Sequence, residues 1–160
     1  DAALFAKIAG YADDAALLAD IDSVVATCCA IKARIVEQDE FDTGLRMLLN
    51  FGHTLGHAVE QHFGYSCFTH GEGVAIGMYQ LTKRTEELGM TAKGSAERIK
   101  SVLEKYNLPL TAGVEKAQLL DTMARDKKKN GNSITLIILQ QIGEGVLQKV
   151  DWQEVPKYLG

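Results

Sequence analysis

The stretch Asn50-Phe-Gly-His-Thr-Leu-Gly-His-Ala-Val-Glu60 decides how this chain is expected to fold and where its chemistry lies. Apolar residues around it recur at helical spacing, which predicts one helix over residues 45–63. At 100° per residue, its polar side chains share a stripe about 80° wide, while the opposite face is apolar. A solvent-facing stripe usually carries Lys, Glu and Gln, so this one favours a buried helix whose polar line faces a site. The stripe consists of Arg46, Asn50, His53, His57 and Glu60.

Glycines mark the close approach of a second backbone. Gly52 and Gly56 lie one turn apart in the predicted helix, although each costs about 1 kcal/mol in a helix interior. The segment Gly71-Glu-Gly-Val-Ala-Ile-Gly77 lacks the G-x-G-x-x-G spacing of a dinucleotide loop and follows no predicted strand. We therefore expect this segment to pack as a helix, and we expect no NAD or flavin cradle in the chain.

The remaining sequence predicts a mainly α fold, a helical bundle with one short C-terminal β-hairpin, in a single domain over residues 1–160. Thr69 and Glu72 have the spacing of a capping box, so a helix is expected to begin there and to end near Gly89. Asp151 is expected to cap a last short helix. The helices are predicted at 2–8, 13–20, 20–38, 45–63, 71–88, 94–106 and 115–129, and the strands at 134–139 and 146–150.

Composition argues against several classes of protein. The 160 residues hold 17 Lys and Arg against 21 Asp and Glu, a net charge of −4, with no long basic block to suit nucleic acid or an acidic membrane. The apolar runs are too short to span a bilayer, and Cys28, Cys29 and Cys67 fit neither a disulfide framework nor a structural zinc site. We therefore expect a cytoplasmic protein, and the start at Asp1 without Met suggests a piece of a longer one.

Three histidines are candidate metal ligands. His53 and His57 are four residues apart, the spacing at which one helix presents two imidazoles to one ion, and His70 opens the next predicted helix. No Glu follows the first histidine, as a metalloprotease motif would require. Spacing alone leaves open whether a metal binds and which of the three histidines hold it.

Two lysines are predicted on apolar helix faces. Lys32 falls between Cys28 and Ile35, which points it into the core, where an ammonium needs an acidic partner or a ligand. A lysine that extends its charge back to the surface is the alternative. Lys127 falls on the buried face of its helix, although the run Arg125-Asp-Lys-Lys-Lys129 as a whole suits the end of a helix dipole.

The quoted motif, followed by His70-Gly-Glu-Gly-Val-Ala-Ile-Gly-Met78, closely resembles the signature of the 3-dehydroquinate synthase family. The resemblance spans essentially the whole chain, since three further segments occur in that family in the same order and at similar spacing. It implies the family's C-terminal, mostly helical domain, without the N-terminal domain that binds NAD. The three segments are Cys28-Cys-Ala-Ile-Lys-Ala33, Asp39-Glu-Phe-Asp-Thr-Gly-Leu-Arg46 and Arg125-Asp-Lys-Lys128.

The resemblance assigns roles to individual residues. It makes His53 and His70 ligands of zinc, or of another divalent metal such as cobalt, and it makes His57 and Lys32 catalytic, with His57 assisting proton transfer. The family's third zinc ligand is a glutamate in a Glu-Val-Ile-Lys segment that this sequence lacks, so the metal site is expected to be incomplete here. Asp42 stands where relatives carry Glu, and its role stays open. The implied substrate-binding residues are Lys32, Arg46, Asn50, His57, Lys127 and Lys128.

The resemblance also implies a lyase of the shikimate pathway, which leads to the aromatic amino acids. Its reaction converts 3-deoxy-D-arabino-heptulosonate 7-phosphate, a phosphorylated keto sugar acid, into 3-dehydroquinate and phosphate with the help of NAD and zinc. The expected partners are this small molecule, the protein's own N-terminal domain and a second copy in a homodimer. The chain by itself is expected to be inactive.

Two other functions are consistent with the residues. A related sugar-phosphate cyclase or a metal-dependent polyol dehydrogenase would share the plan, although Arg46, Asn50 and Lys127 favour an acid that bears phosphate. The other is a non-catalytic helical module for binding a partner. Purely structural histidines would be buried and packed together, whereas histidines of a site would line an open cleft.

Overall fold

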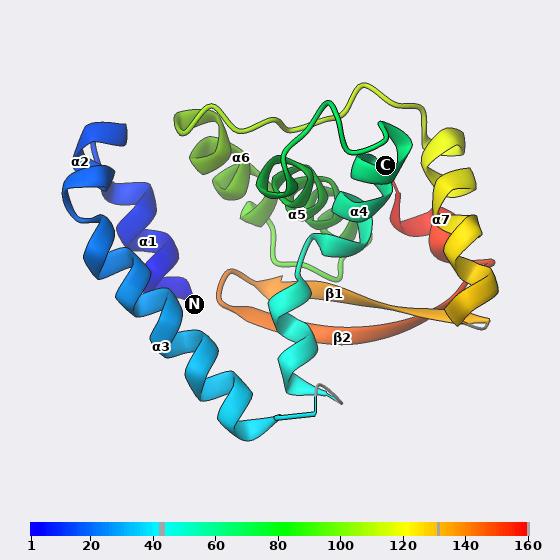
Figure 1. The fold of residues 1–160 in the computed structure, drawn as a ribbon, viewed down its shortest axis with the longest axis horizontal. Helices are drawn as coiled ribbons and strands as arrows, with labels where there is room; N and C mark the ends of the chain where they lie inside the picture. The colour runs from blue at the N-terminus through cyan, green and yellow to red at the C-terminus, as the bar shows by residue number, and fades with distance from the viewer. Residues whose placement is uncertain (42–43, 131, 160) are drawn as a thin grey trace.

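The computed structural model describes residues 1–41, 44–130 and 132–159. It confirms a mainly α fold that ends in a β-hairpin (Figure 1). The α-helices are α1 (Ala2–Gly10), α2 (Asp14–Ala19), α3 (Ile21–Gln38), α4 (His53–His62), α5 (His70–Glu87), α6 (Ser95–Lys105) and α7 (Lys116–Asn130). The strands are β1 (Ser133–Gln141) and β2 (Glu144–Asp151), and two 3-10 helices are η1 (Leu45–Asn50) and η2 (Val155–Tyr158).

The capping box at the start of α5 forms as predicted. The Thr69 hydroxyl accepts a hydrogen bond from the backbone N–H of Glu72, and the Glu72 carboxylate accepts one from the Thr69 N–H at 2.8 Å. These bonds satisfy backbone donors that have no partner inside the helix. The helix ends at Glu87, close to Gly89, whose φ of +73° suits glycine after a helix end. His70, the first residue of α5, is thereby held in a defined position.

The C-terminal hairpin is antiparallel and slightly longer than predicted. Ser133 lies opposite Asp151, and Leu139 lies opposite Gly145. This pairing keeps Asp151 extended as the last residue of β2, so the prediction that it caps a helix is wrong. The short helix that follows is η2, which is preceded by Glu154.

The main core lies between α4, α5, α7 and the hairpin, and a smaller one joins α5 to α6. Figure 1 shows α4 and α5 packed above the two strands with α7 at one end. Burial of this apolar surface stabilises the half of the domain that carries the polar stripe. The main core consists of Leu55, Ala58, Leu81, Met123, Leu136, Ile138, Val150, Val155, Tyr158 and Leu159.

The predicted single helix over residues 45–63 is broken in two. Residues 45–50 form η1, and α4 begins only at His53, after Gly52 with φ of +82°. A Cβ on Gly52 would lie 2.6 Å from the carbonyl oxygen of Val74, so only glycine fits this left-handed turn against α5. The polar stripe is therefore divided between η1 and α4.

Helices α1, α2 and α3 form an arm to one side of this body (Figure 1). Lys7 of α1 pairs with Asp20 at 2.7 Å, just before α3. The helix face around Lys32, which the sequence predicts to be buried, is largely open: Cys28 is exposed, and Ile21 and Val25 on the same face are 37% and 52% exposed. Within the described residues, no helix combines the length and hydropathy needed to cross a membrane.

Glu86 provides a test of how α6 is anchored to α5. Its two carboxylate oxygens accept the backbone N–H groups of Gly94 and Ala96, each at 2.8 Å, at the start of α6. These bonds, of which the one from Ala96 has the larger effect, hold the pKa of the Glu86 carboxyl below its ordinary value of 4.5. We expect Glu86→Ala to lower the free energy of unfolding by about 1 kcal/mol at neutral pH, as loss of a helix cap does.

The pH dependence of this loss of stability in Glu86→Ala follows from the lowered pKa of Glu86. Because the folded chain holds the Glu86 proton less tightly than the unfolded chain, its stabilisation is full above the ordinary pKa and disappears as the pH falls through the lowered one. Thermal denaturation of wild type and Glu86→Ala between neutral and acidic pH measures the difference. A difference that grows on acidification would contradict the assignment.

Candidate functional site

The site is built where α4 crosses α5 with their backbones in contact. A Cβ on Gly56 would lie 2.9 Å from the carbonyl carbon and oxygen of Gly73, and one on Gly77 would overlap the carbonyl oxygen of Gly52. Both predictions about these glycines, close backbone approach and helix packing, are confirmed. The contact brings the start of α5 against the polar side of α4.

This crossing gathers four side chains that we call the histidine cluster: His53, His57 and Glu60 of α4 and His70 of α5. The ring of His53 lies 5.6 Å from that of His57 and 5.0 Å from that of His70, and the rings of His57 and His70 are 5.5 Å apart. The His57 and His70 side chains are 58% and 56% exposed. Histidines this open are not the buried, purely structural set of the non-catalytic alternative.

Glu60 lies beneath the rings and contacts two of them. Its carboxylate lies 3.0 Å from Nδ1 of His57 and 3.2 Å from Nδ1 of His70, and its side chain is only 7% exposed. The third ring, that of His53, has its Nδ1 3.3 Å from the backbone oxygen of Phe51. Sequence reasoning placed Glu60 in the stripe without assigning it a role. The sequence signal that could have identified this role is a carboxylate three residues after a histidine, a spacing at which two side chains of one helix lie together.

The cluster has the donor types that bind zinc. Zinc in proteins takes imidazole nitrogens and carboxylate oxygens, and ligand atoms of His57, Glu60 and His70 lie within 4.8 Å of one another. His53 is not among these three, although the resemblance makes it a ligand. The cluster therefore fits a divalent metal, while the identity of the ligands remains a prediction.

A pocket of about 410 Å³ adjoins the cluster and contains three of the six predicted substrate-binding residues, Lys32, Arg46 and Asn50. Arg46 and Asn50 come from η1, Lys32 comes from α3, and His53 forms the boundary with the cluster. Leu49 supplies the apolar part of the lining. Residues that lie up to 21 positions apart in the sequence thus face one space, as expected of a binding site.

Lys32 reaches this pocket by a different route from the predicted one. The sequence pattern placed it in the core, but its side chain is exposed, because α3 packs at one end of the domain and leaves this face open. The prediction that the ammonium group of Lys32 is buried is therefore wrong. Arg46 is fixed more firmly, since its backbone N–H donates to Asp39 and its guanidinium donates to the Glu40 carbonyl, each at 2.9 Å.

Some predicted residues fall elsewhere. His57 lines a separate cavity of about 240 Å³ with Thr54 and Trp152, so the histidine cluster lies between two pockets. Asp42 and the side chains of Lys127 and Lys128 lie outside the described residues, and their roles stay predictions.

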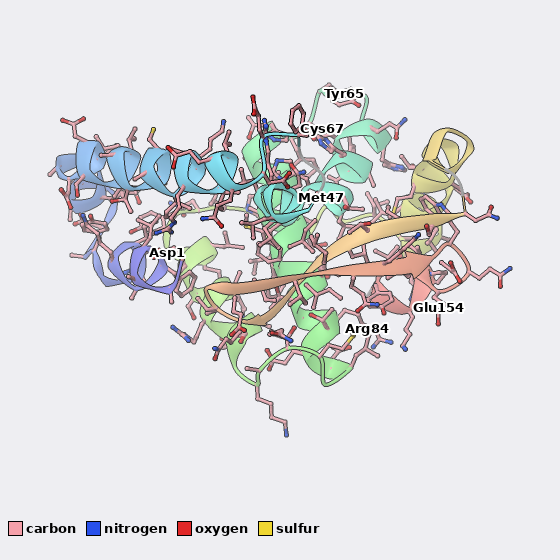
Figure 2. All side chains as sticks on the ribbon, turned by 90° about the horizontal axis from the view of Figure 1, so that it is seen from below. Asp1, Met47, Tyr65, Cys67, Arg84 and Glu154 are labelled. Atoms are coloured by element: carbon pink, nitrogen blue, oxygen red, sulfur yellow. The ribbon has the colours of Figure 1, made fainter. Side chains whose placement is uncertain are left out.

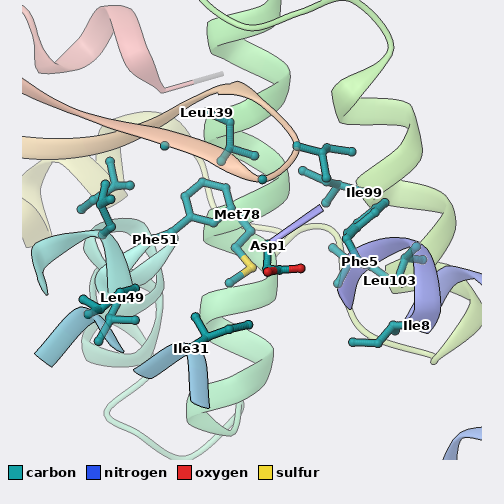
Figure 3. A pocket seen from close by; sticks show the side chains of 17 residues that line it. Asp1, Phe5, Ile8, Ile31, Leu49, Phe51, Met78, Ile99, Leu103 and Leu139 are labelled. Atoms are coloured by element: carbon teal, nitrogen blue, oxygen red, sulfur yellow. The ribbon is translucent and has the colours of Figure 1, made fainter. Parts of the chain in front are cut away.

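Two further features lie apart from the cluster. A cavity of about 430 Å³ between the α1–α3 arm and the body is lined by apolar side chains such as Phe5, Ile31 and Met78, and no predicted site residue lines it (Figure 3). Cys67 is a free, exposed thiol on the loop between α4 and α5, near Tyr65 (Figure 2). Cys28 and Cys29 are also free and exposed, in agreement with the expectation of no disulfide framework.

Comparison with known proteins places these features in a family. Residues 1–129 match the family 3-dehydroquinate synthase C-terminal. The 3-dehydroquinate synthase of Clostridium acetobutylicum is 45% identical over 160 residues, which cover 99% of this chain and 45% of that protein. The 3-dehydroquinate synthase of Enterococcus faecalis is 36% identical, with the same coverage. The chain thus spans less than half the length of these relatives.

Two solved structures share the fold at lower identity. The 2-epi-5-epi-valiolone synthase of Streptomyces hygroscopicus, with NAD+ and Zn2+ bound, superimposes with a TM-score of 0.75 at 20% identity, over 99% of this chain and 45% of that one. A 2-deoxy-scyllo-inosose synthase in complex with carbaglucose-6-phosphate, NAD+ and Co2+ has a TM-score of 0.71 at 19% identity, over 87% of this chain and 40% of that one. At these identities the likeness shows the fold alone.

Proposed function

The chain belongs to the 3-dehydroquinate synthase C-terminal family, and from this premise we propose that it is the C-terminal half of a 3-dehydroquinate synthase. The whole enzyme would convert 3-deoxy-D-arabino-heptulosonate 7-phosphate into 3-dehydroquinate and phosphate. NAD would be held mainly by an N-terminal half, and the homodimer stays a prediction. The observation that carries the proposal is the pocket of Lys32, Arg46 and Asn50, which opens beside the histidine cluster.

The side chains of the pocket suit a small acid with several negative charges. The guanidinium of Arg46 donates one N–H group to Glu40 and retains others in a planar fork, which matches a carboxylate. The ammonium of Lys32 and the amide of Asn50 would bind further oxygens of the substrate. His57 would contact the substrate from the cluster and carry a proton, a role that suits an exposed imidazole.

We further propose that His53 and His70 hold zinc or another divalent ion such as cobalt. When bound, the ion would supply Lewis-acid polarisation of a substrate oxygen. The two solved relatives that hold Zn2+ and Co2+ support a divalent ion in this fold. The glutamate that would complete the ligands belongs to a segment that this sequence lacks.

Reconstitution with a matching N-terminal half tests the whole proposal. This chain is co-expressed with the N-terminal half of the Clostridium acetobutylicum relative, and phosphate release from the heptulosonate phosphate is measured with and without NAD and Zn2+. We expect release that needs both halves and both additions. Faster release from a heptulose phosphate that lacks the carboxylate would instead favour the related cyclases, and release by this chain alone without NAD would contradict the proposal.

Metal binding by the isolated chain gives a separate prediction. Because a third protein ligand is missing, we expect Zn2+ to bind much more weakly than to the reconstituted enzyme, and His53→Gln or His70→Gln to weaken it further by at least about tenfold. Calorimetric titration measures this, with His62→Gln as the matched control, since His62 is a histidine of α4 outside the cluster. Nanomolar binding that survives His53→Gln would show that the ligands are different.

A further inference from the structure

Glu60 is a buried carboxylate that lies between α4, its own helix, and α5. It belongs to α4, and a Cβ on Gly73 of α5 would lie only 3.2 Å from its Cγ, so the glycine leaves room for it. Its side chain is 7% exposed, whereas the His57 and His70 rings above it are more than half exposed. A buried carboxylate is costly unless it is hydrogen-bonded, and these two rings supply the bonds.

The partners of the three rings determine which nitrogen carries the hydrogen. An ionised carboxylate and a backbone carbonyl only accept hydrogen bonds, so an imidazole nitrogen that contacts either must donate. The contacts of His57 and His70 with Glu60, and of His53 with the Phe51 carbonyl, all use Nδ1. Each ring is therefore left with Nε2 as its unprotonated nitrogen.

We infer that Glu60 is a positioning residue, which fixes the tautomer and orientation of His57 and His70 together. Histidines that bind metals commonly donate their other N–H group to a carboxylate in this way. Nε2 of His70 would then be free for a metal, and Nε2 of His57 would be free to accept a proton. The inference rests on the proposed function, because it assigns Glu60 a role relative to those two histidines.

Direct ligation by Glu60 is the competing possibility, since its oxygens lie close enough to the rings to share an ion with them. The contacts of His53 favour the positioning role of Glu60. Because Nδ1 of His53 already donates to the Phe51 carbonyl, His53 can offer only Nε2 to a metal, whereas Glu60 contacts the Nδ1 atoms of the other two rings. Use of Glu60 as a ligand would also remove the acceptor that orients His57 and His70.

The tautomers can be measured without any metal. Imidazole nitrogen chemical shifts of the metal-free wild-type chain should show the proton of His57 and His70 on Nδ1. Glu60→Ala should shift the proton toward Nε2 in both rings, and Glu60→Gln, which keeps the size and one accepting oxygen, should shift it less. Glu97→Gln, an exposed carboxylate of α6, is the charge-matched control. A proton on Nε2 of both rings in the wild-type chain would overturn the inference, whatever the variants do.

Co2+ titration distinguishes a positioning role of Glu60 from direct ligation of the metal by Glu60. It also separates failure of this inference from failure of the proposed metal site. Glu60→Gln should weaken Co2+ binding by about 10- to 100-fold, the usual effect of losing an outer carboxylate, while the shape of the visible Co2+ spectrum is kept. A changed spectrum, as when a ligand is lost, or unchanged affinity would overturn the inference. If His70→Gln binds Co2+ like wild type, the proposed metal site fails, whereas the tautomer measurement still stands on its own.

Discussion

We expect the His57→Gln variant to release phosphate about 10²- to 10⁴-fold more slowly than the wild-type chain in the reconstituted enzyme, the range for loss of a general acid or base. The imidazole of His57 is 58% exposed and is held by Glu60 at 3.0 Å, so it is both accessible to a substrate and oriented. Glutamine has similar bulk but cannot exchange a proton near neutral pH. The loss should therefore appear mainly in kcat.

The same experiment has an internal control on assembly. His57 lies on the open side of α4 rather than in the core, so its replacement should leave thermal stability and association with the N-terminal half unchanged. Gel filtration of the mixture measures association, and His62→Gln should retain full activity. Full activity of His57→Gln would remove His57 from the reaction, and failure of the two halves to associate would assign it a structural role.

We expect Gly77→Ala to lower the free energy of unfolding by about 3 kcal/mol or more, at the upper end of overpacking effects. A Cβ there would overlap the Gly52 carbonyl oxygen and lie 3.0 Å from the backbone nitrogen of Gly56. These neighbours are backbone atoms, which cannot move aside unless α4 and α5 separate. Separation would also pull His70 away from the rest of the histidine cluster, so Co2+ binding should weaken in parallel.

Gly71→Ala is the matched control in the same helix. Apart from its chain neighbours and the backbone of its own helix, no described heavy atom would lie within 4 Å of its Cβ, and its φ is not in the left-handed region. Alanine should therefore be neutral, or stabilising by up to about 1 kcal/mol through its higher helix propensity. Denaturant unfolding of both variants provides the comparison. Equal effects of the two substitutions would contradict the close backbone contact of α4 with α5.

Local patterns explain the parts of the fold that the sequence predicted well. The capping box joins Thr69 to Glu72, three positions further along the chain, and the hairpin depends on β-branched runs that pair across a short loop. The close approach of a second backbone to Gly52 and Gly56 was also predicted, although the sequence did not say that α5 supplies it. In each case the interacting groups are close in sequence or repeat with the period of the element itself.

The same reasoning failed where a distant segment sets the outcome. Gly52 looked like one more helical residue, but the carbonyl of Val74 approaches it so closely that the chain turns there and α4 begins anew. Lys32 looked buried, because a periodic pattern shows which residues share a face and not whether another segment covers it. The error at Gly52 concerns a contact with a distant segment, and the error at Lys32 concerns a face that no segment covers; only the tertiary structure shows either one.

The sequence by itself therefore determined the fold class, the family and the residue types of the site. The approximate positions of the helices other than the one predicted over residues 45–63, and the line of histidines, follow from short-range periodicity and from motifs that need no knowledge of packing. Only the tertiary structure decided that Glu60 contacts His57 on its own helix and His70 on the next, and that η1 and α3 bring Arg46 and Lys32 to one pocket. The reason is physical: these contacts depend on how α3, η1, α4 and α5 are placed relative to one another, which the burial of the core and the glycine contacts set together.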